Sequence, residues 1–236
     1  MDVIEVHPPA DIFVEPGNKT GPYSNVIQTW LRMLNKGYRI PGVVNTDAHY
    51  NFHGSGWLRN YIKSSTDDPS QIDTMEMVHE SEHGHVIMTN GPFLEVTATS
   101  GEKKAIAGDD LAAKDGKVSL AVRVQCPNWF DIDRVQVLIN GKLFEEHRFT
   151  KRETAGKFKA TGPVKFEETI EVTLTEDSHL IVATIGDESK LGPVMGPERG
   201  DDKPVALSNP IFVDVDGGGF KSNGDLLGLP FPYKAE

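Results

Sequence analysis

The sequence has a single cysteine, Cys126, and lacks any long apolar run. One thiol excludes an internal disulfide and a cysteine-based metal site. No apolar stretch approaches the ~20 residues that a membrane-spanning helix needs, so we expect no membrane partner. The N-terminus has no basic start followed by an apolar stretch, so no signal peptide is visible.

Positive charge is also scarce. The chain carries 24 lysines and arginines against 35 acidic residues, a formal net charge of −11. Such a charge repels phosphate backbones, so we expect no nucleic-acid partner. The one mildly basic stretch, residues 151–165, is interrupted by acids and is typical of a solvated hairpin. The 38% hydrophobic and 25% charged composition is that of an ordinary folded protein.

The pattern of apolar residues changes near residue 92. Before it, short apolar runs at Asp2–Val6, Ile40–Val44 and Val86–Thr89 are expected strands, separated by two helical patterns. A strand–helix–strand–helix–strand order predicts parallel α/β architecture. Three strands cannot close a barrel, so this segment is expected to be part of one.

The two helical patterns have clear signals at their ends. The first helix is expected to begin after Ser24 and to end before Gly37, with apolar residues at three- and four-residue intervals: Val26, Ile27, Trp30, Leu31 and Leu34. The second is expected to start near Pro69 and to stop at Gly84. Its apolar residues Ile72, Met75 and Val78 form one stripe, which we expect to be buried.

Beyond residue 92 the apolar residues alternate with a period of two. The expected strands are Phe93–Thr99, Val118–Gln125, Arg134–Ile139, Lys142–Phe149, Val164–Leu174, Leu180–Ile185 and Ile211–Val215. Asn140-Gly141 is a strong hairpin signal. About seven such strands favour an antiparallel β-sandwich of the immunoglobulin-like type. We therefore expect an α/β segment over residues 1–92, an all-β sandwich over 93–216, and a Gly- and Pro-rich tail over 217–236.

The strongest chemical signal is Asn45-Thr46-Asp47-Ala48-His49, directly after an apolar strand. In α/β barrels the loops at the carboxyl ends of strands hold the active site. A carboxylate and an imidazole two residues apart can face one ion when the backbone is bent, and both suit zinc, iron or manganese. The alternative is an Asx turn with a surface histidine.

A family resemblance adds to this pattern. Six short segments of the sequence show this resemblance: Leu34-Asn35-Lys36-Gly37-Tyr38-Arg39-Ile40-Pro41, Asn45-Thr46-Asp47-Ala48-His49, Arg59-Asn60-Tyr61, Thr89-Asn90-Gly91-Pro92-Phe93, Trp129-Phe130-Asp131-Ile132-Asp133-Arg134-Val135 and Ser208-Asn209-Pro210-Ile211-Phe212-Val213-Asp214. In order and spacing they resemble the C-terminal part of a PHP-family metallohydrolase, in the carbaryl-hydrolase-like (CehA/McbA) branch, with its β-sandwich domain.

The resemblance implies a distorted β/α barrel with two or three divalent metals (zinc, manganese or iron). They activate water to attack a phosphoester, ester or carbamate-type bond of a small-molecule substrate. Asp47 and His49 match late metal ligands of the family, and His53 and Arg59 are candidate substrate contacts. The family's early His-x-His has no match, so we expect a segment that is not a competent catalyst alone. We favour truncation as the reason, with a degenerate relative as the alternative. Exposed barrel edges would then promote self-association.

Two alternatives stay open. In the first, the sandwich is a non-catalytic module that binds a carbohydrate or a protein. His79-Glu80-Ser81-Glu82-His83 is a literal HExxH, the pattern of zinc peptidases, with Gly84 stopping its helix at once and only His85 near as a third ligand. A weaker signal is the run from Asp214 to Gly219, which resembles the opening of a calcium loop with Asp225 at the twelfth position.

Overall fold

The computed structural model describes residues 2–14, 26–49 and 56–228. These residues form three sheets, three α-helices and four short 3-10 helices. The helices are α1 (Val26–Asn35), α2 (Thr74–His83), α3 (Gly196–Arg199), η1 (Pro9–Phe13), η2 (Pro69–Gln71), η3 (Ala155–Lys157) and η4 (Pro193–Met195). Among the described residues, no helix is long and apolar enough to cross a membrane.

The largest sheet has eight strands, with β10-β9-β12-β13-β4-β3 in order and β14 pairing with β12 and β7. These strands are β3 (Arg59–Ile62), β4 (Val86–Thr89), β7 (Asp110–Ala112), β9 (Arg134–Ile139), β10 (Lys142–Thr150), β12 (Ser178–Ile185), β13 (Val205–Ser208) and β14 (Ile211–Asp214). All its pairings are antiparallel except β14 with β7.

A four-stranded antiparallel sheet, in the order β11-β8-β5-β6, faces it across a shared hydrophobic core. Its strands are β5 (Phe93–Ser100), β6 (Lys103–Ala105), β8 (Lys117–Gln125) and β11 (Val164–Thr173). Along β8 buried residues alternate with more exposed ones, because one face packs on the core and the other meets solvent. The expected β-sandwich is thus confirmed.

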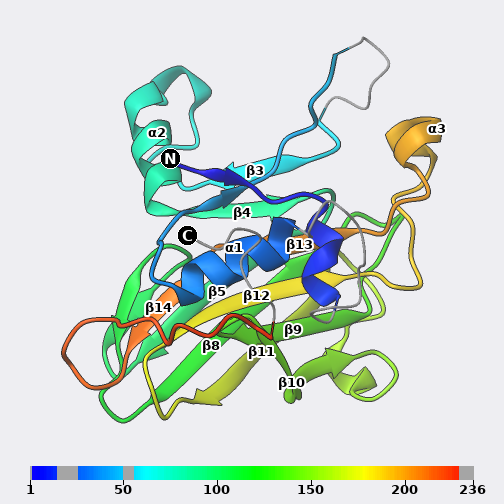
Figure 1. Cartoon of the computed structure of the whole chain (residues 1–236). Helices are drawn as coiled ribbons and strands as arrows, with labels where there is room; N and C mark the ends of the chain where they lie inside the picture. Colours follow the sequence, from blue (N-terminus) through cyan, green and yellow to red (C-terminus); the bar gives the residue numbers. More distant parts are fainter. Residues whose placement is uncertain (1, 15–25, 50–55, 229–236) are drawn as a thin grey trace.

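The middle of the eight-stranded sheet is covered on both faces. All eight residues of β12 are buried, as are all four of β13. One face packs against the four-stranded sheet, and α1 with η1 lies over the other (Figure 1). The apolar face of α1 supplies Ile27, Trp30, Leu31 and Leu34, all at 0% exposure. A strand buried on both sides reads as a continuous apolar run, which explains the sequence of β12.

Every strand expected after residue 92 is present, with bounds within two residues. The turn between β9 and β10 is the expected two-residue hairpin, since Asn140 and Gly141 both have positive φ, 51° and 75°. Four short strands were missed: β3, β6, β7 and β13. Each has only three or four residues, too few for a period of two to stand out.

The parallel arrangement expected for the first part is found in only one pair. β1 (Ile4–Glu5) and β2 (Gly42–Val43) are parallel. The expected third parallel strand, β4, is instead antiparallel to both its neighbours, β3 and β13. An apolar run does not specify the direction of pairing, and β13, more than 100 residues later, supplies the partner. Strands from both sides of residue 92 therefore share one sheet.

The second helix ends where expected, but it begins at Thr74 rather than near Pro69, which starts the separate η2, and its burial differs from the expectation. Asp73 caps α2 by accepting a hydrogen bond from the Met75 N–H, and Gly84 ends it with φ 81°. The stripe expected to be buried is exposed: Ile72 at 37%, Met75 at 53% and Val78 at 45%. This expectation was wrong because polar residues of α2, described below, make its contacts with the body.

Buried asparagine side chains join distant segments. Asn209 accepts a hydrogen bond from the Gly42 N–H (2.7 Å) and donates to the carbonyls of Gly42 (2.9 Å) and Val86 (3.1 Å). At the end of α1, Asn35 donates to the Asn140 carbonyl (3.0 Å) and its Oδ1 lies 2.8 Å from His179 Nε2. These amides complete hydrogen bonds that no neighbouring strand supplies.

The chain after β14 lies against the body as far as it is described. Phe220 packs on Phe212 with ring centroids 5.0 Å apart. The Gly224 N–H donates to the Asn35 carbonyl (2.7 Å), and Leu227 is only 6% exposed. The Gly-rich segment thus helps to cover the end of α1.

We predict that Asn209→Ala lowers the free energy of unfolding by about 2–4 kcal/mol, because it leaves the buried N–H and C=O groups of Gly42 without their side-chain partner and removes one of the two hydrogen bonds to the Val86 carbonyl. Urea unfolding at pH 7 measures this. Asn128→Ala, at an exposed loop position, is the matched control and should change it by less than about 0.5 kcal/mol. Equal effects at the two positions would contradict the role of Asn209.

A second prediction concerns pH. His179 is fully buried, and burial lowers its pKa to about 3, whereas an unfolded histidine titrates near ~6.5. Between these values only the unfolded chain binds the proton, so stability is complete above pH ~6.5 and falls as the pH drops toward 3, by about 1.4 kcal/mol per pH unit. Relative to His179→Gln, wild-type protein should lose about 2 kcal/mol between pH 6.5 and 5 in urea titrations. Parallel pH curves for the two proteins would refute this assignment.

Candidate functional site

The loop that holds Asp47 and His49 follows β2. β1 and β2 run parallel, so their carboxyl ends meet at one edge, where the loop begins. Asn60 on β3 brackets the end of β2: its Oδ1 accepts from the Val44 N–H (2.9 Å) and its Nδ2 donates to the Val44 carbonyl (2.7 Å). The loop therefore starts from a fixed backbone position.

Within the loop the backbone bends sharply. The Asp47 N–H donates to Asn45 Oδ1 (2.9 Å), an Asx turn, and Asp47 has φ 47°. A left-handed aspartate is uncommon but tolerated, because its short polar side chain bonds locally. In an extended strand, residues two apart share a face but are spaced about 6.6 Å along the chain, so the bend is what brings the two side chains within 3.0 Å of each other.

The side chains of Asp47 and His49 meet. His49 Nε2 lies 3.0 Å from Asp47 Oδ1, and the two side chains are 68% and 80% exposed, respectively. An oxygen and a ring nitrogen at this separation face a common point at the surface. The geometry has the form that the sequence pattern requires of a ligand pair, and it also has the Asx turn of the alternative interpretation.

The two candidate substrate contacts have different outcomes. His53 lies outside the described residues. Arg59 is half-buried on β3, and its Nη2 donates to the Asn90 carbonyl (3.1 Å). Part of its guanidinium is thus committed to a backbone contact.

A second group of side chains lies beside the loop that holds Asp47 and His49. His7 follows β1 and makes an edge contact with Trp57, with ring centroids 5.6 Å apart. Trp57 is only 4% exposed, and the Arg199 guanidinium stacks 3.9 Å from its ring centroid. Thr46 Oγ1 donates to the Leu58 carbonyl (3.4 Å), so the loop and the Trp57 region are adjacent. The sequence pattern did not single out this contact.

The HExxH segment forms the expected helix, but its side chains contact other groups of the protein. His83 Nδ1 lies 2.7 Å from the His79 carbonyl, and His79 Nδ1 lies 3.4 Å from Glu82. Glu80, the residue that serves as base in this pattern, contacts His85 and lies 3.5 Å from Lys63 Nζ. No third ligand joins His79 and His83 within the described ranges.

His85 is held between two carboxylates. Its Nδ1 contacts Glu80, and its Nε2 lies 2.9 Å from Asp109 Oδ1. Burial acts to raise the pKa of Glu80, but His85 and Lys63 outweigh it, and the pKa lies below its usual value. Both ring nitrogens face acceptors, so a protonated ring satisfies both carboxylates. This cluster fastens the end of α2 to the turn before β7.

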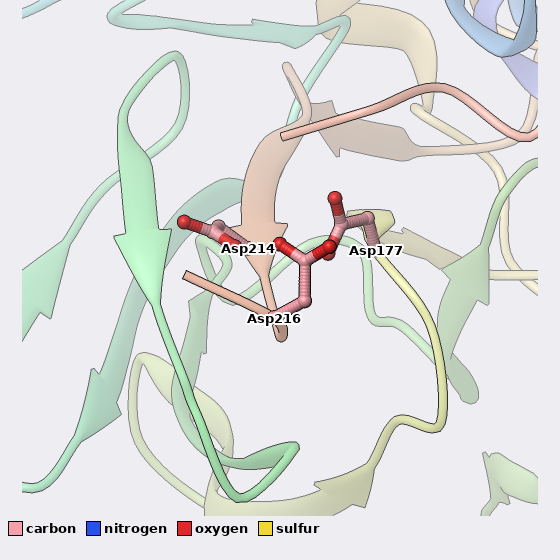
Figure 2. Close-up of side chains that lie close together, drawn as sticks. All are labelled: Asp177, Asp214 and Asp216. Atoms are coloured by element: carbon pink, nitrogen blue, oxygen red, sulfur yellow. The ribbon is translucent and has the colours of Figure 1, made fainter. Parts of the chain in front are cut away.

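Three other carboxylates gather at the end of β14, as Figure 2 shows. Asp177, Asp214 and Asp216 are the only three potential metal-binding side chains, among the residues that the structure describes, whose ligand atoms all lie within 4.8 Å of one another. Lys221 Nζ donates to Asp216 (2.8 Å) and, with a backbone N–H, lowers its pKa. Asp225 instead pairs with Lys142, so the calcium-loop spacing does not bring it to this cluster.

Backbone N–H groups also donate hydrogen bonds to these carboxylates. Asp214 accepts from the N–H groups of Gly217 (2.7 Å) and Gly219 (3.0 Å), and Asp177 accepts from those of Val215 (2.8 Å) and Lys221 (2.9 Å). This is the pattern of a tightly closed turn.

A cavity of about 230 Å³ lies elsewhere, between the end of α2 and β14. Its walls include Arg39, Pro41, His83, Asp110 and Phe212. Arg39 stacks 3.9 Å from the Phe212 ring centroid and donates to Asp110 (2.9 Å). Neither Asp47 nor His49 lines this cavity, so it is separate from the candidate ligand pair.

We predict that His85→Ala lowers the free energy of unfolding by about 1.5–3 kcal/mol and speeds amide exchange in α2, because the contacts with the Glu80 and Asp109 carboxylates are lost. Urea unfolding and hydrogen exchange at pH 7 test this. His79→Ala, which removes a side chain that is 61% exposed on the same helix, is the control and should cost less than about 0.5 kcal/mol. Equal costs would show that the cluster does not hold α2.

Comparison with known proteins assigns no relative. No family model matches the chain, and no curated protein or solved structure matches it.

Proposed function

We propose that this chain is the late segment of a PHP-type metal-dependent hydrolase, in which Asp47 and His49 are metal ligands. The order of the family-like motifs along the chain supports this relationship. The observation that carries it is the contact between Asp47 and His49, 3.0 Å apart on a bent, exposed loop at the carboxyl edge of a parallel strand pair. In the proposed arrangement, β1 and β2 are part of the barrel.

The residues fit a divalent metal in type. A carboxylate oxygen and an imidazole nitrogen are ligands of zinc, manganese and iron. Asn45 and Asn60 hold the loop so that both donors stay together. A catalytic zinc site has three protein ligands, and no third candidate joins this pair within residues 2–14, 26–49 and 56–228. By itself the chain is therefore proposed to be inactive.

When bound, the metal would supply Lewis acidity and lower the pKa of a water that attacks a phosphoester, ester or carbamate-type bond. Asp47 and His49 would hold it through Oδ1 and Nε2. Arg59 is proposed to orient an anionic or carbonyl group of the substrate with the N–H groups that Asn90 does not use. His53 is proposed to contact the same substrate.

A non-catalytic binding module is the second candidate. The observation that favours it is Trp129, an aromatic side chain that is 57% exposed on the sandwich beside Phe130. Exposed aromatic rings are typical of surfaces that bind sugars or proteins. In this candidate function, the chain binds no metal through Asp47 and His49.

We predict weak binding of Mn²⁺ or Zn²⁺ that depends on the Asp47–His49 loop. Asp47→Asn and His49→Ala should each lower the affinity at least about tenfold, since the first removes the negative charge of one ligand and the second removes the other ligand. Isothermal titration of the chain with each metal at pH 7.5 measures this. The matched controls are His79→Ala and His83→Ala, which remove exposed histidines of the HExxH segment.

The four variants separate the candidates. Loss of zinc binding in His83→Ala with no change in His49→Ala would assign the metal to the HExxH segment. Unchanged binding in both would leave Asp47 and His49 as an Asx turn with a surface histidine. No binding by the unmodified chain favours the non-catalytic module.

A further inference from the structure

Helix α2 exposes its apolar side chains. Met75, Met77 and Val78 are 53%, 40% and 45% exposed, and Ile72, just before the helix, is 37% exposed. None of the ten residues of α2 is buried. Ile72, Met75 and Val78 follow one another at three-residue intervals and so share one side, which we call the α2 apolar surface. The helix lies at the periphery of the molecule, beside β3 and β4 (Figure 1).

The opposite side of α2 attaches to the body through polar contacts. The Glu76 carboxylate accepts from the Ser65 N–H (2.8 Å) and from Ser65 Oγ (3.0 Å). Glu80 contacts His85 and Lys63. Surface helices usually bury the apolar side and expose the polar one. Here the polarity is reversed, so the attachment to the body leaves the apolar side available.

The surroundings of this surface are acidic. Between Ser64 and His85 the chain has six acidic residues and no lysine or arginine: Asp67, Asp68, Asp73, Glu76, Glu80 and Glu82. Lys63, just before this segment, pairs with Glu80. Apolar side chains within a negative field complement a ligand that is both apolar and positively charged.

We propose that the α2 apolar surface is a docking site for a basic amphipathic helix of a partner protein. Met75 suits this role, because its flexible thioether adapts to a packed helix. A second copy of this chain would bring the same acidic segment and be repelled. Anionic lipid headgroups would be repelled as well.

The test uses a defined probe. An 18-residue peptide of leucine and lysine, spaced to give one apolar and one basic helical face, is labelled with fluorescein and titrated with the chain at 0.15 M NaCl. Fluorescence anisotropy gives the affinity. Met75→Ser combined with Val78→Ser should weaken binding at least about tenfold, because the peptide loses apolar contacts.

Two valine variants provide the matched control. Val78→Ser should weaken binding about fivefold, whereas Val194→Ser, at a valine that is 65% exposed elsewhere, should leave it unchanged. Both positions are exposed, so both variants should unfold at the wild-type temperature. That pattern of affinities would support the docking site.

Several results would overturn the proposal. One is no peptide binding, and another is equal affinities for Val78→Ser and Val194→Ser, which would show attraction by charge alone. A dimer in light scattering that Met75→Ser/Val78→Ser abolishes would make a second copy the occupant. Sedimentation with phosphatidylcholine vesicles that the same variant abolishes would make it a lipid surface.

Discussion

Buried amide side chains fasten the first part of this chain to its sandwich. Asn209 is the central one, since its side chain forms hydrogen bonds with the N–H and the carbonyl of Gly42 and with the carbonyl of Val86. These residues lie 167 and 123 positions away in the sequence. An asparagine amide has donors and an acceptor in the same spacing as a peptide group, so it can replace a missing strand. Leaving such buried groups unpaired would cost about 1–3 kcal/mol each.

The position of the Asp47–His49 loop follows from these contacts. Asn209 fixes Gly42 at the start of β2, and Asn60 brackets Val44 at its end. The loop leaves β2 only three residues before Asp47, so little freedom remains in where its side chains emerge. Loops carry functional groups well when rigid elements hold their ends. The position of the exposed Asp47–His49 pair thus depends on a buried framework.

The two long helices use opposite sides to reach the body. α1 buries Trp30 and three aliphatic residues on β12 and β13, and its end is tied through Asn35 to Asn140 and His179. α2 is held by Glu76, Glu80 and the His85 cluster, and it turns its methionines outward. Burial of apolar side chains holds α1 on the body, whereas ion pairs and hydrogen bonds hold α2. This difference makes α2 a surface for recognition rather than part of the core.

The sequence by itself determined the elements whose signals are local. The alternation along Lys117–Gln125, the Asn140-Gly141 turn, the Asp73 cap and the Gly84 stop each depend on neighbours a few residues away, and each is present in the structure. The proximity of Asp47 and His49 in sequence also identified the candidate pair. Their contact required the left-handed backbone at Asp47, which no pattern specifies.

Tertiary structure decided the rest. The antiparallel direction of β4 depends on β13, the burial of β12 on both faces depends on α1, and the outward face of α2 depends on which of its sides meets Ser65 and His85. The physical reason is that pairing direction and burial depend on the partner that occupies each surface. Those partners come from segments that lie up to more than 100 residues away.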